Sequence, residues 1–399
     1  MNKSIVAKAF YTLFVLCLVL ISTVSCSKEG TNDTFSFVYL FPDELAEWEL
    51  VQSGAEQAIN DFVQQNKQIS VDVDFFTADC ATVLCNNLTN TSVTAANGIC
   101  IAMPYFPKSY AEESAVAAEK QKSDYRSLFY ISNLIKEITN NGVPVITIGN
   151  DQYLCSNDLN DPYSWGEYME PPSRSCFVGS DNIAFGRRIA EKAIDMQGGA
   201  AQIYYNWGWL RSTEQINRCI GLNDVVSEKI GDGTKIICSC GGLSSHPYPI
   251  DEHGVYFTGI QTVYYPDDGD TEPRTEEYDM NCFCDILFED DMRVNGNEIN
   301  SFISLWRGGN FISDYFREKG LGDTASNIDH LVLLSEDSPY VLKAVKEKYA
   351  TLTLIEDRYE WGYQSAKLLL EYAVKNKMPE SDSVYTPVYW VDYESVWDY

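Results

Sequence analysis

The feature that most constrains this chain is a regular alternation between short apolar runs and segments of helical periodicity. Residues 35–41 read as a buried strand, and apolar side chains from Leu45 to Phe62 recur at the spacing of a helix. Residues 70–77 then alternate as a half-buried strand does. Strands that alternate with helices predict parallel sheets that are covered by helices on both faces.

The number of strands argues for two lobes. About eleven strand-like runs are too many for one sheet in a chain of 399 residues, and one core stops growing at about 250–300 residues. We therefore expect an α/β fold of two doubly wound parallel-sheet lobes, with a ligand cleft between them at the carboxyl ends of the strands. The other predicted strands are residues 98–105, 143–149, 176–179, 201–206, 234–239, 301–306, 330–335, 351–355 and 385–391. The other predicted helices are residues 110–139, 181–196, 212–230, 310–319, 339–347 and 361–375.

The amino-terminal segment has the pattern of an export signal. Lys3 and Lys8 precede an apolar run over residues 10–24, and small residues follow this run. The run is too short, and too polar at its end, for a membrane span. We expect residues 1–25 to be a signal peptide and residues 26–32 to be a polar tether, which places the mature protein outside the cytoplasm.

The end of this segment also resembles a lipid attachment site. Thr23-Val24-Ser25-Cys26 is similar to the bacterial lipobox, in which a small residue precedes a cysteine that takes a lipid. A lipid on Cys26 would anchor the protein in the periplasm or at the cell surface. Ordinary cleavage beside Cys26 without a lipid is the alternative, and it would leave a secreted protein.

The charge of the chain excludes several classes of partner. The sequence has 29 Lys and Arg residues against 58 Asp and Glu residues, which gives a formal net charge of -29 at pH 7. Such a chain repels the phosphates of nucleic acids and offers no basic face for docking on anionic lipid. We therefore expect no nucleic-acid partner.

The cysteines indicate an oxidising compartment. The chain contains 12 cysteines. Those that follow Cys26 are Cys80, Cys85, Cys100, Cys155, Cys176, Cys219, Cys238, Cys240, Cys282 and Cys284. An even number in an exported chain favours disulfides, although their pairing cannot be read from sequence. Zinc is the alternative, but the two Cys-x-Cys pairs differ from the usual Cys-x2-Cys spacing, so we expect disulfides, no metal site and no cofactor.

No catalytic motif stands out in the sequence. The three histidines, His246, His253 and His330, form no His-Glu-x-x-His motif. The chain has no Gly-x-Ser-x-Gly nucleophile elbow and no Gly-x-Gly-x-x-Gly turn after its first strand. We therefore expect a protein that is not an enzyme.

Several short motifs occur in an order that is found in one known family. They are Phe37–Tyr39 with Ser53-Gly54-Ala55, Val143–Gly149, Phe177–Asn182 with Gly186, and Arg218–Leu222. Together they resemble the type I periplasmic solute-binding proteins, the group that includes the ribose- and galactose-binding proteins. The resemblance covers nearly all of the mature chain, apart from insertions near residues 78–97, 106–125, 152–174 and 243–298.

The resemblance implies two lobes joined by three hinge strands, which close over a ligand held between them. The first lobe would comprise residues 33–178 and be completed by residues 358–384. The second lobe would comprise residues 179–357 and be completed by residues 385–399.

The resemblance also implies a set of ligand contacts. Trp48 would stack on the apolar face of a sugar, with packing in the core as the alternative. Arg218 would donate two hydrogen bonds to hydroxyls or to a carboxylate, with a surface ion pair to Glu214 or Asp224 as the alternative. The implied contacts are Leu45, Trp48, Asn150, Asp151, Arg218, Trp306, Arg307, Glu336, Asp337 and Glu356.

These positions depart from those of a standard pentose site. The acid–arginine pair that the family carries after the strand at residues 143–149 is not preserved as such at Asn150 and Asp151. The implied site is more acidic and more aromatic than one for ribose. A different sugar, a polyol or a ligand with a cationic group would suit it better, because rings and carboxylates together hold cations.

The sequence therefore predicts an exported, monomeric solute-binding protein that delivers a small polar ligand to an ABC-type membrane transporter. An extracytoplasmic sensor or receptor domain on the same fold is the alternative, and the many cysteines and large insertions favour it. A transcription repressor is excluded, because the export segment stands where the DNA-binding helices would be. A transporter encoded next door would favour uptake, whereas a kinase or receptor neighbour would favour sensing.

Overall fold

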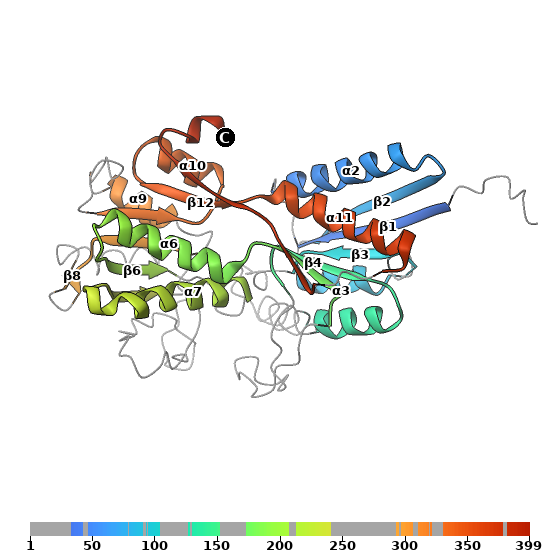
Figure 1. Ribbon diagram of the computed structural model, residues 1–399, viewed down its shortest axis with the longest axis horizontal. Coiled ribbons are helices and arrows are strands. Elements are labelled where there is room, and N and C mark those ends of the chain that lie inside the picture. Colours follow the sequence, from blue (N-terminus) through green and yellow to red (C-terminus); the bar gives the residue numbers. More distant parts are fainter. Residues whose placement is uncertain are drawn as a thin grey trace, which may run out of the picture.

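The structure, a computed structural model, shows two lobes, each built on one six-stranded sheet (Figure 1). It describes residues 33–42, 47–78, 80–90, 93, 95–103, 127, 130–151, 173–206, 213–240, 293–294, 297–305, 310–318, 320, 330–377 and 381–399. The predicted signal peptide at residues 1–25 and the tether at residues 26–32 lie outside these ranges. Within them, no helix combines the length and the apolar character that crossing a membrane requires.

The first sheet is parallel throughout. Its strands are β1 (Asp33–Phe41), β2 (Ile69–Thr77), β3 (Gly98–Ile101), β4 (Val145–Ile148), β5 (Cys176–Gly179) and β13 (Ser383–Tyr385). They lie in the order β13-β5-β4-β3-β1-β2, and every neighbouring pair is parallel. From β1 the chain moves to one side for β2 and to the other for β3, β4 and β5, which is the winding of a doubly wound sheet.

Helices cover both faces of the first sheet (Figure 1). They are α2 (Glu47–Gln65) and α11 (Arg358–Lys375) on one face, and α3 (Ala81–Leu88) and the helix at residues 130–140 on the other. Phe37 and Tyr39 of β1 pack in the core with α2 and α11, whereas Val38 and Leu40 pack in the core with α3. A strand that is buried on both faces needs apolar side chains at consecutive positions, so its sequence is a continuous apolar run.

The second sheet has the same winding with one exception at its edge. Its strands are β6 (Gln202–Asn206), β7 (Lys235–Cys240), β10 (Ser301–Ser304), β11 (Leu331–Leu334), β12 (Leu352–Glu356) and β14 (Val388–Asp392). They lie in the order β14-β12-β11-β10-β6-β7. All pairs are parallel except β12 with β14, which is antiparallel. A two-stranded ribbon of β8 (Arg293–Val294) and β9 (Asn297–Glu298) comes before β10 along the chain.

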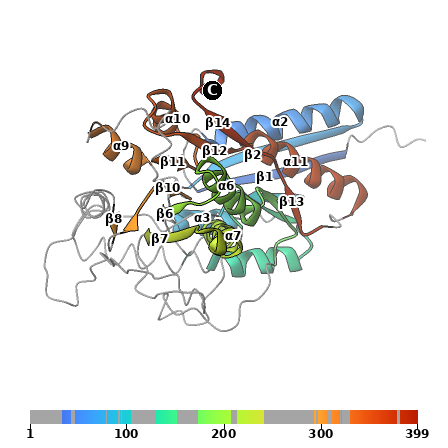
Figure 2. The ribbon, with the colours of Figure 1, turned by 60° about the vertical axis from the view of Figure 1, so that its left-hand side comes forward.

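Among the described residues, four helices cover the second sheet. They are α6 (Asn182–Met196) and α7 (Thr213–Lys229) on one face, and α9 (Asn310–Glu318) and α10 (Pro339–Lys346) on the other. Figures 1 and 2 both show α6 and α7 side by side along the sheet. The last turn of the chain, η4 (Val396–Asp398), contacts α10.

The α/β fold class with two doubly wound lobes is confirmed, but the last predicted strand is wrong. Residues 385–391 form the end of β13 in the first lobe and the start of β14 in the second. The chain leaves one sheet and enters the other at Thr386 and Pro387. A proline has no N–H group to donate to a ladder, so it suits a break between two strands better than the middle of one. The expected purely parallel second sheet is corrected by the same observation, because β14 runs against β12.

Glycines allow the helices of each lobe to approach closely. In the first lobe, a Cβ atom on Gly54 of α2 would collide with the backbone of α11, and one on Gly362 of α11 would collide with the backbone of α2. In the second lobe, Gly186 of α6 and Gly221 of α7 face the other helix's backbone in the same way. A side chain at any of these positions would push the two helices apart.

The structure contradicts the predicted disulfides at the cysteines whose side chains it describes. None of these five forms a disulfide; they are Cys80, Cys85, Cys100, Cys176 and Cys219. Cys85 and Cys100 lie in cores on opposite faces of the first sheet, so the sheet separates their sulfur atoms. Cys219 is buried in the second lobe. The side chains of Cys155, Cys238, Cys240, Cys282 and Cys284 lie outside the described part of the structure.

Candidate functional site

In the described part of the structure, the chain passes between the lobes three times. The first crossing is residues 179–182, between β5 and α6; the second is residues 356–358, between β12 and α11; the third is residues 385–388, between β13 and β14. Figure 1 shows the third crossing as the dark red ribbon that runs from one lobe to the other. β5 and β12 enter crossings at their carboxyl ends, so the carboxyl ends of both sheets' parallel strands lie toward the hinge.

Backbone hydrogen bonds link the third crossing to the other two. The Thr386 amide donates to the carbonyl oxygen of Gly179 at 2.8 Å. The Asp357 amide donates to the carbonyl oxygen of Pro387 at 3.2 Å. The three crossings therefore form one hydrogen-bonded hinge.

Trp361 connects this hinge to the core of the first lobe. Its indole Nε1 donates to Thr386 Oγ1 at 3.0 Å, and both side chains are buried. Gly149, just after β4, has φ +69, and a Cβ atom there would lie 2.7 Å from Cζ3 of the Trp361 ring. Only glycine combines this backbone conformation with so close an approach, so the chain can turn directly over the indole.

Arg218 lies at the centre of a buried network beside the hinge. Its Nη2 atom is 2.8 Å from Glu214 Oε1 and 2.9 Å from Glu356 Oε1, and its side chain is 1% exposed. Its Nε donates to Asn182 Oδ1 at 2.9 Å. Its Nη1 donates to the carbonyl oxygen of Leu305 at 3.3 Å. An ion pair with Glu214 is therefore formed, but it is buried and not at the surface as the alternative had it, and Glu356 adds a second carboxylate to the pair.

A second arginine extends the network to the other lobe. Nη1 of Arg358, the first residue of α11, is 2.6 Å from Oδ1 of Asp337, which follows β11 in the second lobe. The exposed fractions of these side chains are 7% and 17%. We call Glu214, Arg218, Glu356, Arg358 and Asp337 the hinge network. Its three carboxylates outnumber its two guanidinium groups, so its formal charge is negative.

The Glu356 carboxylate is stabilised in its charged form. Burial raises the pKa of this group, but the guanidinium groups of Arg218 and Arg358 more than offset burial and lower the pKa from its ordinary value of 4.5. Both arginines therefore favour the charged form of Glu356.

We expect acid to weaken the second lobe by protonating Glu356. Because the folded-state pKa is lowered, this group's contribution to stability is complete above its unfolded-state pKa and is lost as the pH falls through the folded-state pKa. Glu356→Gln removes that dependence. Its free energy of unfolding, measured with urea, should fall less steeply between about pH 5 and about pH 3 than that of the wild type. Equal slopes in the two proteins would contradict the lowered pKa.

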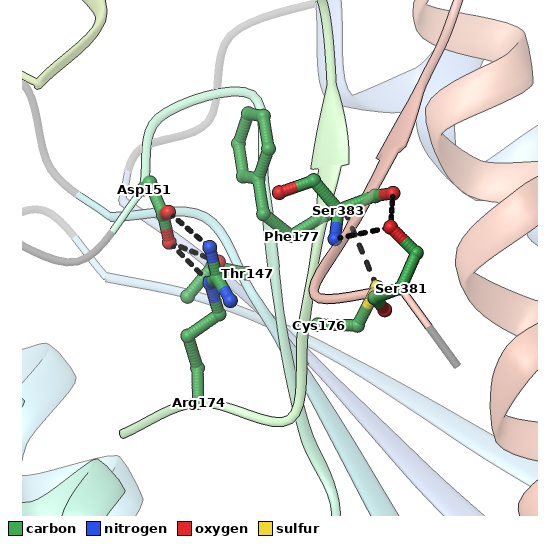
Figure 3. A network of polar contacts seen from close by, with 7 residues as sticks. All are labelled: Thr147, Asp151, Arg174, Cys176, Phe177, Ser381 and Ser383. Carbon is green, nitrogen blue, oxygen red and sulfur yellow. Dashed lines mark hydrogen bonds and ion pairs between the residues drawn. The ribbon is translucent and has the colours of Figure 1, made fainter. Parts of the chain in front are cut away.

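Asp151 forms an acid–arginine pair that the sequence did not reveal. Figure 3 shows its carboxylate facing the guanidinium of Arg174, with Nε to Oδ1 at 2.8 Å and Nη2 to Oδ2 at 2.6 Å. Thr147 Oγ1 donates to the same carboxylate at 2.6 Å. Such a bidentate pair is geometrically specific, and here it joins Asp151, just before the predicted insertion at residues 152–174, to Arg174, the last residue of that range.

Cys176 lies close to this pair, on the strand that follows Arg174 (Figure 3). Its thiol donates to the carbonyl oxygen of Phe177 at 3.4 Å and to that of Ser381 at 3.7 Å. Burial raises the pKa of the thiol to about 11, so the group is protonated at neutral pH. A protonated, buried thiol is unsuited to nucleophilic chemistry, and Cys176 acts as part of the core.

The remaining predicted contacts have different surroundings. The Trp48 ring is 4% exposed and stacks on Phe41, with centroids 5.1 Å apart and planes 9° apart. Asn150 is buried after β4, and its Nδ2 donates to the carbonyl oxygen of Met103 at 3.4 Å. The Glu336 backbone exchanges hydrogen bonds with the hydroxyl of Thr353, at 3.0 and 2.7 Å. Leu45, Trp306 and Arg307 lie outside the described part of the structure.

The structure thus brings three of the predicted residues, Arg218, Glu356 and Asp337, into one network. Several further polar side chains are buried just at or after the carboxyl ends of strands; they are Asn150, Ser180, Asn206, Ser304 and Ser335. Amide and hydroxyl groups at this edge of two facing sheets can donate and accept hydrogen bonds with a small polar molecule.

Comparisons with known proteins identify the fold. No protein-family model matches the sequence, and no curated protein matches it. Similar solved structures include a glucose-galactose binding protein from Geobacillus stearothermophilus, with 16% identity over 91% of this chain and 98% of that one and a TM-score of 0.58. A periplasmic ribose ABC transporter from Conexibacter woesei has 15% identity over 93% and 96%, with a TM-score of 0.60. A putative LacI transcriptional regulator from Bacteroides fragilis has 14% identity over 92% and 100%, with a TM-score of 0.57. The chain therefore has the type I periplasmic binding fold.

Proposed function

We propose that this chain, which has the type I periplasmic binding fold, is an exported solute-binding protein that captures a small polar ligand between its lobes. The observation that carries the proposal is the arrangement of two parallel-sheet lobes whose strands end at a hinge of three crossings. In this arrangement a ligand that contacts both lobes stabilises the closed form, because its contacts with the second lobe exist only there.

A sugar or a polyol is the ligand class that we favour. The buried amides and hydroxyls at the strand ends suit a molecule with many hydroxyl groups. The net charge of -29 and the negative hinge network disfavour an anion. The solved structures with this fold include a protein described as a glucose-galactose binding protein and one described as a periplasmic ribose ABC transporter, which supports the same class.

The proposed contacts divide into two groups. Asn150 and Glu336 come two residues after the ends of β4 and β11. In the sequence, Leu45 comes just before α2, and Trp306 and Arg307 come just after β10. We propose these five as ligand contacts. Arg218, Glu356 and Asp337 bond mainly to one another, Asp151 bonds to Arg174, and Trp48 packs on Phe41, so we propose that these act by shaping the site.

We further propose that the protein works outside the cytoplasm as a monomer, held by a lipid on Cys26 or secreted, and passes its ligand to an ABC-type transporter. Lobes comprising residues 33–178 with 358–384, and 179–357 with 385–399, are part of this proposal. A sensor or receptor domain is the second candidate. The likeness to a putative transcriptional regulator supports it, because regulators on this fold use a bound ligand as a signal rather than as cargo.

The proposal predicts that a neutral sugar or polyol raises the stability of the mature protein. A ligand that binds only the folded state adds about 2.7 kcal/mol at a free concentration of about 100 times its Kd. A thermal-shift screen over neutral sugars, polyols, amino sugars and sugar acids measures this effect, and calorimetry gives the affinity of each hit. Small-angle scattering should show a smaller radius of gyration for the protein with the best ligand than for the ligand-free protein. If no compound in the panel shifts the melting temperature, the proposed ligand class is wrong.

A further inference from the structure

The second crossing is only three residues long, and each of them is held in place. Glu356 contacts Arg218 of α7 at 2.9 Å. Asp357 caps α11 by accepting from the Glu360 amide at 3.0 Å. Arg358 contacts Asp337 at 2.6 Å. The crossing is therefore fixed by charges at both ends and by a helix cap between them.

Arg218 also reaches the first crossing. Its Nε donates to Asn182, which ends that crossing, while its Nη2 contacts Glu356 in the second. A guanidinium group is planar and its donors are fixed relative to one another. One side chain therefore sets the distance between two of the three crossings. The Thr386 amide links the first and third crossings, so each crossing is bonded to another one.

The pair of Arg358 and Asp337 joins the two lobes directly. Arg358 begins α11, which is packed against α2 of the first lobe through the close approach at Gly54 and Gly362. Asp337 lies in the turn between β11 and α10 of the second lobe. A rotation of one lobe against the other must change the separation of these two groups. By contrast, Glu214 and Arg218 lie one turn apart on the same helix, so their contact is insensitive to such a rotation.

We propose that Arg218 and Arg358 are positioning residues of the hinge, which set the relative orientation of the lobes in the ligand-free protein through Glu356, Asn182 and Asp337. Arg218 then acts on the hinge and not as a donor to the ligand. Ion pairs suit this role, because their geometry is directional whereas apolar contacts can slide. The proposal concerns the protein without ligand, so its test does not depend on the proposed function.

The test compares Asp337→Asn with Glu214→Gln. Both changes replace a carboxylate of the hinge network by an amide of the same size, but only the first removes an ion pair between lobes, which leaves at most a weaker hydrogen bond to a neutral amide. Hydrogen exchange is followed at the Asp357 and Thr386 amides, which bond across the crossings. In ligand-free Asp337→Asn we expect both amides to exchange at least about tenfold faster than in wild type, because the crossings open locally more often.

Two references separate a hinge effect from general loss of stability. The amides of Ala102 and Leu305 bond within the first and second lobe, to Leu40 and Asn206, and should keep their wild-type exchange rates in Asp337→Asn. Glu214→Gln should lower the melting temperature. The ratio of the exchange rates at the hinge amides to those at the lobe amides should stay as in wild type. Small-angle scattering should show a larger radius of gyration for Asp337→Asn alone.

Arg358→Lys provides a second variant that keeps the charge but loses the guanidinium fork. We expect a smaller rise in exchange at the same two amides than in Asp337→Asn. If the Asp357 and Thr386 amides exchange at the same rate in Asp337→Asn, Glu214→Gln and wild type, the proposal is overturned. A rise that appears equally at the lobe amides would also overturn it, because that would show a purely structural role.

Discussion

Arg218→Met is expected to lower the free energy of unfolding by about 3–5 kcal/mol at neutral pH, which is the usual cost of removing one partner from a buried charge network. The substitution keeps a long side chain over Phe185, where the guanidinium carbon now lies 3.9 Å from the ring centroid. It leaves Glu214 and Glu356 buried, close together and without their shared cation. Denaturant unfolding of the purified protein measures the loss.

The matched control is Arg187→Met. Arg187 lies on α6 and contacts Glu191, Asp224 and Glu228, but its side chain is 32% exposed. Exposed pairs contribute about 0–1 kcal/mol, so this change should cost little. The loss in Arg218→Met should also shrink toward acid pH, where the two carboxylates take up protons. If Arg218→Met costs no more than the control, Arg218 does not hold the network together.

Gly362→Ala is expected to cost about 3 kcal/mol, the upper end of the usual range for overpacking. A Cβ atom at this position would collide with the carbonyl oxygen of Val51 on α2. Backbone atoms cannot rotate away as a side chain can, so α2 and α11 must separate along their length. Alanine's better helix propensity returns about 1 kcal/mol and does not offset this cost. Thermal and urea unfolding of the variant measure the net effect.

Gly231→Ala is the control for this substitution. Gly231 lies in the short turn η1 (Ile230–Asp232), and a Cβ atom there would meet nothing within 4 Å. We expect a change within about 0.5 kcal/mol, as for most surface substitutions. A small effect in both variants would show that α2 and α11 adjust freely, and that Gly362 is not needed for their packing.

Most of the fold could be predicted because its strands are buried on both faces. Such strands appear as apolar runs that differ clearly from the helices between them, as at residues 35–41 and 331–334. The run at residues 385–391 misled the prediction because it is apolar on both sides of Pro387, and local pattern does not say that a run changes sheets there. The helix α3 lies within residues 78–97, where we predicted only an insertion.

The site was predictable only in part, because its contacts join residues that are far apart in the chain. Arg218 could be singled out from its motif, and its helical neighbour Glu214 followed from the spacing of four residues. Arg358 carried no such signal, since a charged residue after a strand is usually solvated. The partner of Asp151 is 23 residues away along the chain, so sequence alone did not connect them.

Because the described chain crosses between the lobes three times, each lobe contains elements that are synthesised early and elements that are synthesised late. Almost the whole chain must leave the ribosome before α11 exists, and until then the face of α2 that α11 covers stays open to solvent. The second lobe's core elements, by contrast, are nearly all made before α11 appears. We therefore expect the first lobe to gain its last contacts slowly, since they span more than three hundred residues of chain, as between Tyr39 and Ser365, and such long-range pairing is slow.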